Sequence, residues 1–158
     1  MNLKQLKDEV IIPTLDFLDL NSESAVNLLI GTVCAESAGG KDLKQLGGGP
    51  ALGIYQMEPA THDDIFKNYL AYKPELMSKV LCLSIVMGEG FTEGHRQLVF
   101  NLVYATAMAR IHYLRVKESL PRSTNVIALA EYWKKYYNTH KGAGTVDHFI
   151  ESYQRGHA

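Results

Sequence analysis

The chain has 158 residues, of which 46% are hydrophobic; this is enough for one domain with its own core and too short for two ordinary domains. The formal net charge of -1, from 16 basic and 17 acidic residues, gives no support for a nucleic-acid partner. The N-terminal stretch up to Leu20 contains acidic residues and no uninterrupted apolar run, which excludes a secretory signal or a membrane span there. We therefore expect synthesis in the cytoplasm without an export signal and no stable membrane insertion.

The first half of the chain predicts helices separated by a glycine-rich loop. Apolar residues at three- and four-residue spacing predict a helix over residues 3–20, which Pro13 should kink or split. Ser22 is suited to cap a second helix, and the glycines at 39–40 should end it. After the loop, Pro59 should open a short helix that ends before Pro74.

The second half also predicts helices. The run over residues 75–87 predicts a mostly buried helix, and residues 95–120 predict the longest helix, which Pro121 should stop. Thr124 or Asn125 should cap the following helix, and a last short helix is expected over residues 146–153. No convincing strand pattern is present, so the sequence predicts an all-α single domain over residues 1–158.

Cysteines and histidines give no indication of a metal or cofactor. Cys34 and Cys82 lie in apolar segments, which is more typical of buried thiols than of a disulfide. The 6 histidines lack the HExxH motif and paired ligand spacing. The chain has no Gly-x-Ser-x-Gly motif, and Cys34 lies inside an apolar helix, so a serine or cysteine hydrolase is poorly supported.

Glu36 is the main candidate for acid–base chemistry. It has small neighbours and lies near the end of its predicted helix, where the helix dipole disfavours a negative charge. Partial burial at this position should raise the pKa of the carboxyl group, as a general acid near neutral pH requires. The alternative is that Glu36 is an ordinary glutamate on a solvated helix face.

A longer motif surrounds this glutamate. Glu36-Ser37 is followed, after a loop, by Gly53-Ile54-Tyr55-Gln56-Met57, with Pro59 and Thr61 next. This pattern resembles the signature of soluble lytic transglycosylases and goose-type lysozymes. The resemblance implies a lysozyme-like fold of about seven helices, with Glu36 as the catalytic residue and Ser37, Gly53, Tyr55 and Gln56 in a glycan-binding cleft.

The second half resembles the family less closely. Residues 106–114 keep only the final Tyr-Leu of an expected helix motif. The family also has a tyrosine, followed by asparagine, whose hydroxyl faces the catalytic glutamate. Tyr132 fits the alanine spacing of this motif, although Trp133 stands where asparagine is expected. Tyr137-Asn138 is the second candidate pair. We predict Tyr132 as the catalytic partner and Tyr137 and Asn138 as substrate-binding residues.

The resemblance implies cleavage of the β-1,4 bond between N-acetylmuramic acid and N-acetylglucosamine in peptidoglycan. Most glycosidases use two carboxylates, whereas Asp42, Glu58 and Asp63 near Glu36 form no recognisable partner motif. A single carboxylate favours a lytic transglycosylase that forms a 1,6-anhydro product. A hydrolytic lysozyme on the same fold and a non-catalytic virion or glycan-binding module remain as alternatives.

The expected lack of an export signal is typical of a bacteriophage protein, either an endolysin or a virion-associated enzyme with phage virion proteins as partners. In both cases it would act on the cell wall in the periplasm, after release during lysis or from the virion.

Overall fold

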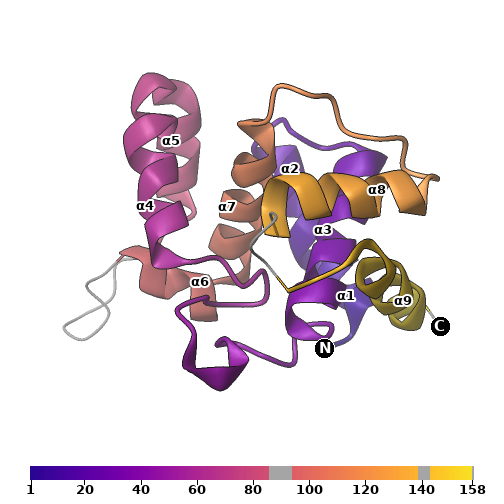
Figure 1. The fold of residues 1–158 in the computed structure, drawn as a ribbon. Coiled ribbons are helices and arrows are strands. Elements are labelled where there is room, and N and C mark those ends of the chain that lie inside the picture. Colours follow the sequence, from indigo (N-terminus) through magenta and orange to yellow (C-terminus); the bar gives the residue numbers. More distant parts are fainter. Residues whose placement is uncertain (86–93, 139–142, 158) are drawn as a thin grey trace.

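The computed structural model describes residues 1–85, 94–138 and 143–157. Within these ranges every regular element is helical, and extended pairing is limited to the isolated bridges Lys44–Leu52 and Leu52–Met57. The predicted all-α fold class is therefore confirmed (Figure 1).

The N-terminal segment forms α1 (Leu3–Leu6), a π-helical stretch (Lys7–Ile11) and α2 (Ile12–Phe17) in direct succession. Pro13 lies in the first turn of α2, where its missing N–H is tolerated. The predicted disturbance of this helix thus takes the form of a π-helical widening just before the proline.

Helix α3 (Glu23–Ser37) lies at the centre of the fold. The Ser22 hydroxyl accepts a hydrogen bond from the Ala25 N–H at 3.1 Å, which confirms the predicted cap. The helix ends where Ala38 adopts the left-handed conformation, with φ of 48°. Because α3 packs against α7, α8, α9 and the π-helical stretch Lys7–Ile11, most of its surface is buried.

The next elements are α4 (Pro59–Asn68), a 3₁₀ turn (Leu70–Tyr72) and α5 (Pro74–Cys82), which form one side of the molecule in Figure 1. The prediction that residues 75–87 are mostly buried is wrong for α5, because Val80 is its only buried residue. This short helix lies at the edge of the fold, so only one side of it faces the core. Residues 86–87 lie outside the described ranges.

Helix α7 (Leu102–Leu114) lies between that side and the side formed by α3, α8 and α9 (Figure 1). The single long helix predicted over residues 95–120 is wrong. A 3₁₀ turn (Gly94–Arg96) and α6 (Gln97–Phe100) come first, and Asn101 then breaks the helix and caps α7 by accepting from the Tyr104 N–H at 3.0 Å. The helix ends at Leu114, well before Pro121.

The C-terminal part contains α8 (Val126–Trp133), a π-helical segment (Lys134–Asn138) and α9 (Val146–His157). Asn125 caps α8 by accepting from the Ala128 N–H at 3.0 Å, which selects it over Thr124. Helix α9 extends past the predicted end at Tyr153 and packs along α3.

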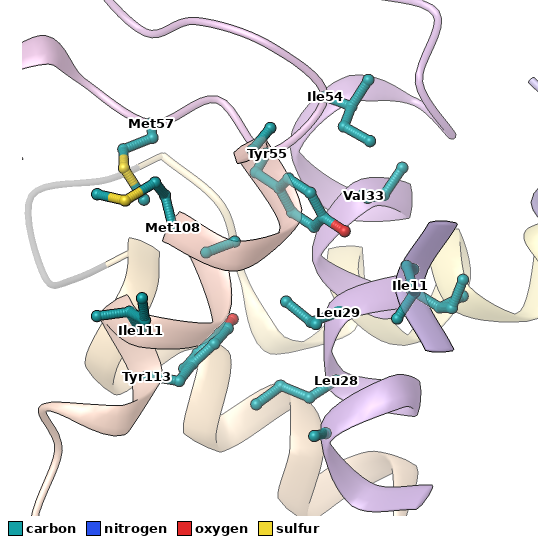
Figure 2. Packing of buried hydrophobic residues seen from close by; sticks show 14 of the residues in the cluster. Ile11, Leu28, Leu29, Val33, Ile54, Tyr55, Met57, Met108, Ile111 and Tyr113 are labelled. Carbon is teal, nitrogen blue, oxygen red and sulfur yellow. The ribbon is translucent and has the colours of Figure 1, made fainter. Parts of the chain in front are cut away.

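The hydrophobic core joins α3, α7 and the segment over residues 51–57. Figure 2 shows side chains from all three packed together, with Ile11 of the N-terminal segment beside α3: Leu28, Leu29, Val33, Ile54, Tyr55, Met57, Met108, Ile111 and Tyr113. This core fixes the end of α3, and hence Glu36, against the loop that follows it.

Candidate active site

A cleft of about 600 Å³ opens beside the end of α3. Glu36 lies in it together with residues of the π-helical segment Lys134–Asn138 and of the loop that leads into α4. Residues separated by about a hundred positions in sequence thus line one concave surface. Clefts with a few convergent polar groups are the usual form of a small-molecule or substrate site.

The Glu36 carboxyl group is partly buried and hydrogen-bonded. Its Oε1 atom accepts from the Trp133 Nε1–H at 2.9 Å, and the Asn138 side chain also hydrogen-bonds to it. Burial raises the pKa of Glu36, while these two donors and the nearby side chains of His148 and Lys134 oppose that rise. A carboxyl group held in this way retains its proton at higher pH than an ordinary glutamate.

The orientation of Asn138 follows from its other partner. Lys134 Nζ donates to Asn138 Oδ1 at 2.8 Å, so the amide NH₂ group is the part available to Glu36. Both neighbours of the carboxyl group, Trp133 and Asn138, are therefore N–H donors.

The π-helical segment explains why both donors reach the same carboxyl group. Trp133 and Asn138 are five residues apart, a spacing that falls on one side of a π-helix and drifts off the face of an α-helix. Single π-helical turns inserted in α-helices are frequent at functional sites.

Within the Gly53–Met57 segment, Met57 and Gln56 line the cleft, and Gln56 is the polar one. It adopts a left-handed backbone conformation with φ of 46°, and its Nε2 group donates to the Gly53 carbonyl at 2.8 Å. Gly53 itself has φ of 72°, and a Cβ atom there would overlap the Leu98 backbone carbonyl. Only glycine fits this close approach, which fixes the turn that presents Gln56.

The structure places Ser37, Gly53 and Tyr55 beneath the cleft. Ser37 is 0% exposed, and its hydroxyl lies 2.6 Å from the Ile54 carbonyl oxygen and 3.0 Å from that of Val33. Tyr55 is also buried, with its hydroxyl 3.1 Å from Thr106 Oγ1. In this conformation these predicted substrate-binding residues join the end of α3 to the loop and present no surface to a ligand.

The structure does not bring Tyr132 to Glu36. The Tyr132 hydroxyl donates to the Glu118 carbonyl at 2.8 Å, and Tyr132 does not line the cleft. Tyr137 does line it, and its hydroxyl donates to the Tyr55 carbonyl at 2.8 Å. Burial raises the pKa of Tyr137, and the nearby Glu36 charge adds to that rise. The alternative pair Tyr137-Asn138 is thus the one beside Glu36.

Sequence reasoning missed several residues of the site and left others without a role. Trp133 was interpreted only as a departure from the expected asparagine, and His112 and His148 were weighed only as metal ligands, yet all three line the cleft. Spacing held one signal for Trp133, since it precedes Tyr137 by four residues and shares its helix face. Asp42 and Glu58, which formed no sequence motif, also line the cleft.

Both cysteines are free, and their environments differ. Cys34 is buried, as predicted, and burial raises the pKa of its thiol to about 11. Cys82 is exposed, so its predicted burial is wrong.

Among the residues that the structure describes, no group of three or more His, Cys, Asp or Glu side chains is placed to hold a metal ion. None of the helices over those same residues is both long enough and apolar enough to cross a bilayer.

The chain matches no protein-family model, no curated protein and no solved structure at a significant level. Its function is therefore inferred from the cleft and from the motifs that supply the cleft residues.

Proposed function

We propose that this protein is a peptidoglycan-degrading lytic transglycosylase with Glu36 as its general acid and base. The observation that carries the proposal is the Glu36 carboxyl group itself. It is partly buried in a cleft, accepts hydrogen bonds from Trp133 and Asn138, and has a raised pKa. Such a group keeps its proton to higher pH than an ordinary glutamate and can give it to a substrate in the cleft.

In the proposed reaction the substrate provides the nucleophile. Glu36 protonates the glycosidic oxygen while the N-acetyl oxygen of the muramic acid attacks C1, and the bond to the leaving sugar breaks. Glu36, now a carboxylate, takes the proton of the C6 hydroxyl as that oxygen displaces the N-acetyl group at C1. The product carries a 1,6-anhydro end, and the carboxyl group regains its proton.

The polar character of the cleft agrees with an N-acetylated glycan as substrate. Gln56 and Asn138 provide amide groups, and Tyr137 provides aromatic surface, on which sugar rings commonly pack. Binding energy along the glycan strand would be used to orient the scissile bond over Glu36.

Hydrolysis by the same site is the alternative that a specific observation favours. Asp42 and Glu58 line the cleft with Glu36, and a second carboxylate can act as a general base for water. A hydrolase would release reducing ends in place of anhydro ends. A non-catalytic glycan-binding module with the same cleft would release neither.

The experiment is digestion of purified peptidoglycan sacculi followed by mass spectrometry of the released muropeptides. We expect products lighter by one water than lysozyme products, and none from Glu36→Gln. Reducing ends that disappear in Asp42→Asn or Glu58→Gln would replace the transglycosylase by a hydrolase. Retained activity in Glu36→Gln would remove the catalytic assignment, and an inactive wild-type protein that binds sacculi would favour the binding module.

The biological setting is a further part of the proposal. An enzyme that cleaves peptidoglycan suits a bacteriophage, either as an endolysin that reaches the wall during lysis or as a virion component that opens the wall during entry.

A further inference from the structure

A hydrogen-bonded chain of side chains connects α4 to the cleft. Asp64 of α4 accepts from Arg115 Nη1 at 2.6 Å, and Arg115 Nη2 lies 2.8 Å from His112 Nδ1 in the last turn of α7. His112 lines the cleft, and its ring packs edge-on against the Tyr137 ring with 4.8 Å between centroids. The chain thus ends at the segment that contains Asn138, one of the two donors to Glu36.

The donors and acceptors in this chain are determined by Arg115. A guanidinium group can only donate, so Nδ1 of His112 must accept and carries no proton. The single ring proton of the neutral imidazole is therefore on Nε2. This N–H donates to the backbone carbonyl of Tyr136, inside the π-helical segment Lys134–Asn138. Burial and the Arg115 charge lower the pKa of His112 to about 4, so the ring stays neutral at neutral pH.

Within the described part of the protein, the position of the Arg115 guanidinium group leaves one of its hydrogen-bond donors without a partner. Its Nε atom is buried and has no hydrogen-bond partner among the residues that the structure describes. An unpartnered buried donor is unfavourable, so the contacts to Asp64 and His112 must determine where the guanidinium group lies. A side chain that only filled space would not need this arrangement.

We propose that His112 is a positioning residue: through the Asp64–Arg115–His112 chain it holds the Tyr136 carbonyl and the Tyr137 ring, and so keeps Asn138 aimed at Glu36. A π-helical turn is an unfavourable backbone state that persists where tertiary contacts fix it. The imidazole provides such a contact, because one nitrogen accepts from α7 and the other donates to the turn.

The alternative role for His112 is packing alone, and two substitutions separate the roles. His112→Phe keeps the ring volume against Tyr137 and removes both ring nitrogens. His112→Gln loses the ring and keeps a donor near the Nε2 position. If His112 only packs, His112→Phe should stay closer to wild type in turnover and in the Glu36 midpoint than His112→Gln. If His112 positions the turn, His112→Gln should stay closer to wild type than His112→Phe.

Trp133 allows a measurement that needs no activity, because it is the single tryptophan of the chain and donates directly to Glu36. Its fluorescence should report the protonation of Glu36, and Glu36→Gln identifies that transition by losing it. The basic side chains near Glu36, His148 and Lys134, are unchanged in every variant. Loss of the Asn138 donor should raise the Glu36 midpoint by roughly one pH unit in His112→Phe, and by less in His112→Gln.

Asp64→Asn extends the test to an exposed residue, whose substitution leaves the core intact. Asp19→Asn is its matched control, because Asp19 pairs with Lys79 of another element away from the cleft. We expect an upward shift for Asp64→Asn and none for Asp19→Asn. On peptidoglycan, kcat should fall roughly 10-fold in His112→Phe with KM within about twofold, because positioning acts on the reacting geometry.

Equal midpoints in wild type, His112→Phe and Asp64→Asn would overturn the inference, as would a variant order in which Phe outperforms Gln. The kinetic readout rests on the proposed function, whereas the fluorescence titration does not. An inactive wild type that still shows the midpoint shifts would contradict the proposed function and leave the positioning role standing.

Discussion

At Glu36, burial and hydrogen bonding act on the carboxyl group in opposite directions. Burial raises the pKa and is the larger effect, so the folded protein binds this proton more tightly than the unfolded chain does. The resulting stabilisation is fully present below the ordinary carboxyl pKa. It is lost as pH rises through the folded-state pKa, because the folded protein must then hold a partly buried charge.

Glu36→Gln should therefore change stability in a pH-dependent way. At pH 7 the variant should melt at the wild-type temperature or above it, since the neutral amide removes the buried charge. Below about pH 4 wild-type Glu36 is protonated in both states, and the two melting curves should converge. Activity should fall about 10²–10⁴-fold at every pH. A lower melting temperature for the variant at pH 7 would mean that the bonds from Trp133 and Asn138 outweigh burial.

The two candidate tyrosines make a second residue-scale test. Tyr137→Phe leaves the buried Tyr55 carbonyl without its donor beside the cleft, and a displacement there should lower turnover roughly 10²-fold. Tyr132→Phe loses a bond to the Glu118 carbonyl away from Glu36 and should keep near-wild-type turnover. Turnover measured on soluble glycan strands, with melting curves as the folding control, distinguishes them. The reverse order would return the catalytic role to Tyr132.

Helix boundaries set by contacts between residues close in sequence could be predicted, and a boundary set by a long-range contact could not. The caps at Ser22 and Asn125 were predicted because each is a bond between residues three apart. The break at Asn101 was missed because the apolar pattern runs straight through it. Its side-chain amide donates to the Leu83 carbonyl at 2.9 Å, a contact between segments that only the folded chain brings together.

The π-helical segment Lys134–Asn138 illustrates the same limit at the candidate site. Glu36 and the Tyr137-Asn138 pair were recognised as candidates from the sequence alone. The choice between Tyr132 and Tyr137, however, depends on which side of the helix faces α3. That side is determined by a widened turn and by His112 on another helix, and neither leaves a periodic signal in the sequence.

Close packing of α3 and α9 leads to an element-scale prediction. A Cβ atom at Gly31 would overlap the Phe149 ring, so Gly31→Ala should push α9 away from α3. We expect a loss of about 1–3 kcal/mol in unfolding free energy, although alanine normally stabilises a helix relative to glycine by about 0.5–1 kcal/mol.

Chemical denaturation of Gly31→Ala, Phe149→Leu and the double variant measures this contact. Because leucine vacates part of the space of the ring, the double variant should be more stable than the sum of the single effects predicts. Additive effects, or stabilisation by Gly31→Ala alone, would show that α9 does not approach α3 this closely. The displacement should also reach the cleft, since Phe149 packs on Trp133 with 5.3 Å between ring centroids.

At the scale of the whole molecule, the cleft is assembled from segments that lie far apart in the chain. Its lining includes Glu36 near the end of α3, Trp133 at the end of α8, and Glu58 and Thr61 at the start of α4. A ligand that contacts several of these segments binds only the folded protein. Binding must therefore raise the melting temperature of the whole domain.

If the proposed substrate class is right, inactive Glu36→Gln should be stabilised by an N-acetylglucosamine oligomer. At a concentration one hundred times the measured Kd, binding adds about 2.7 kcal/mol. For a chain of this length that corresponds to roughly 5–10 °C in melting temperature. A β-1,4 glucose oligomer of equal length, which lacks the N-acetyl groups, should give a much smaller shift. Equal shifts with both oligomers, or none with either, would argue against an N-acetylated glycan in the cleft. The variant Gln56→Ala with Glu36→Gln should reduce the shift, measured from its own melting temperature without ligand, by weakening binding to the glycan.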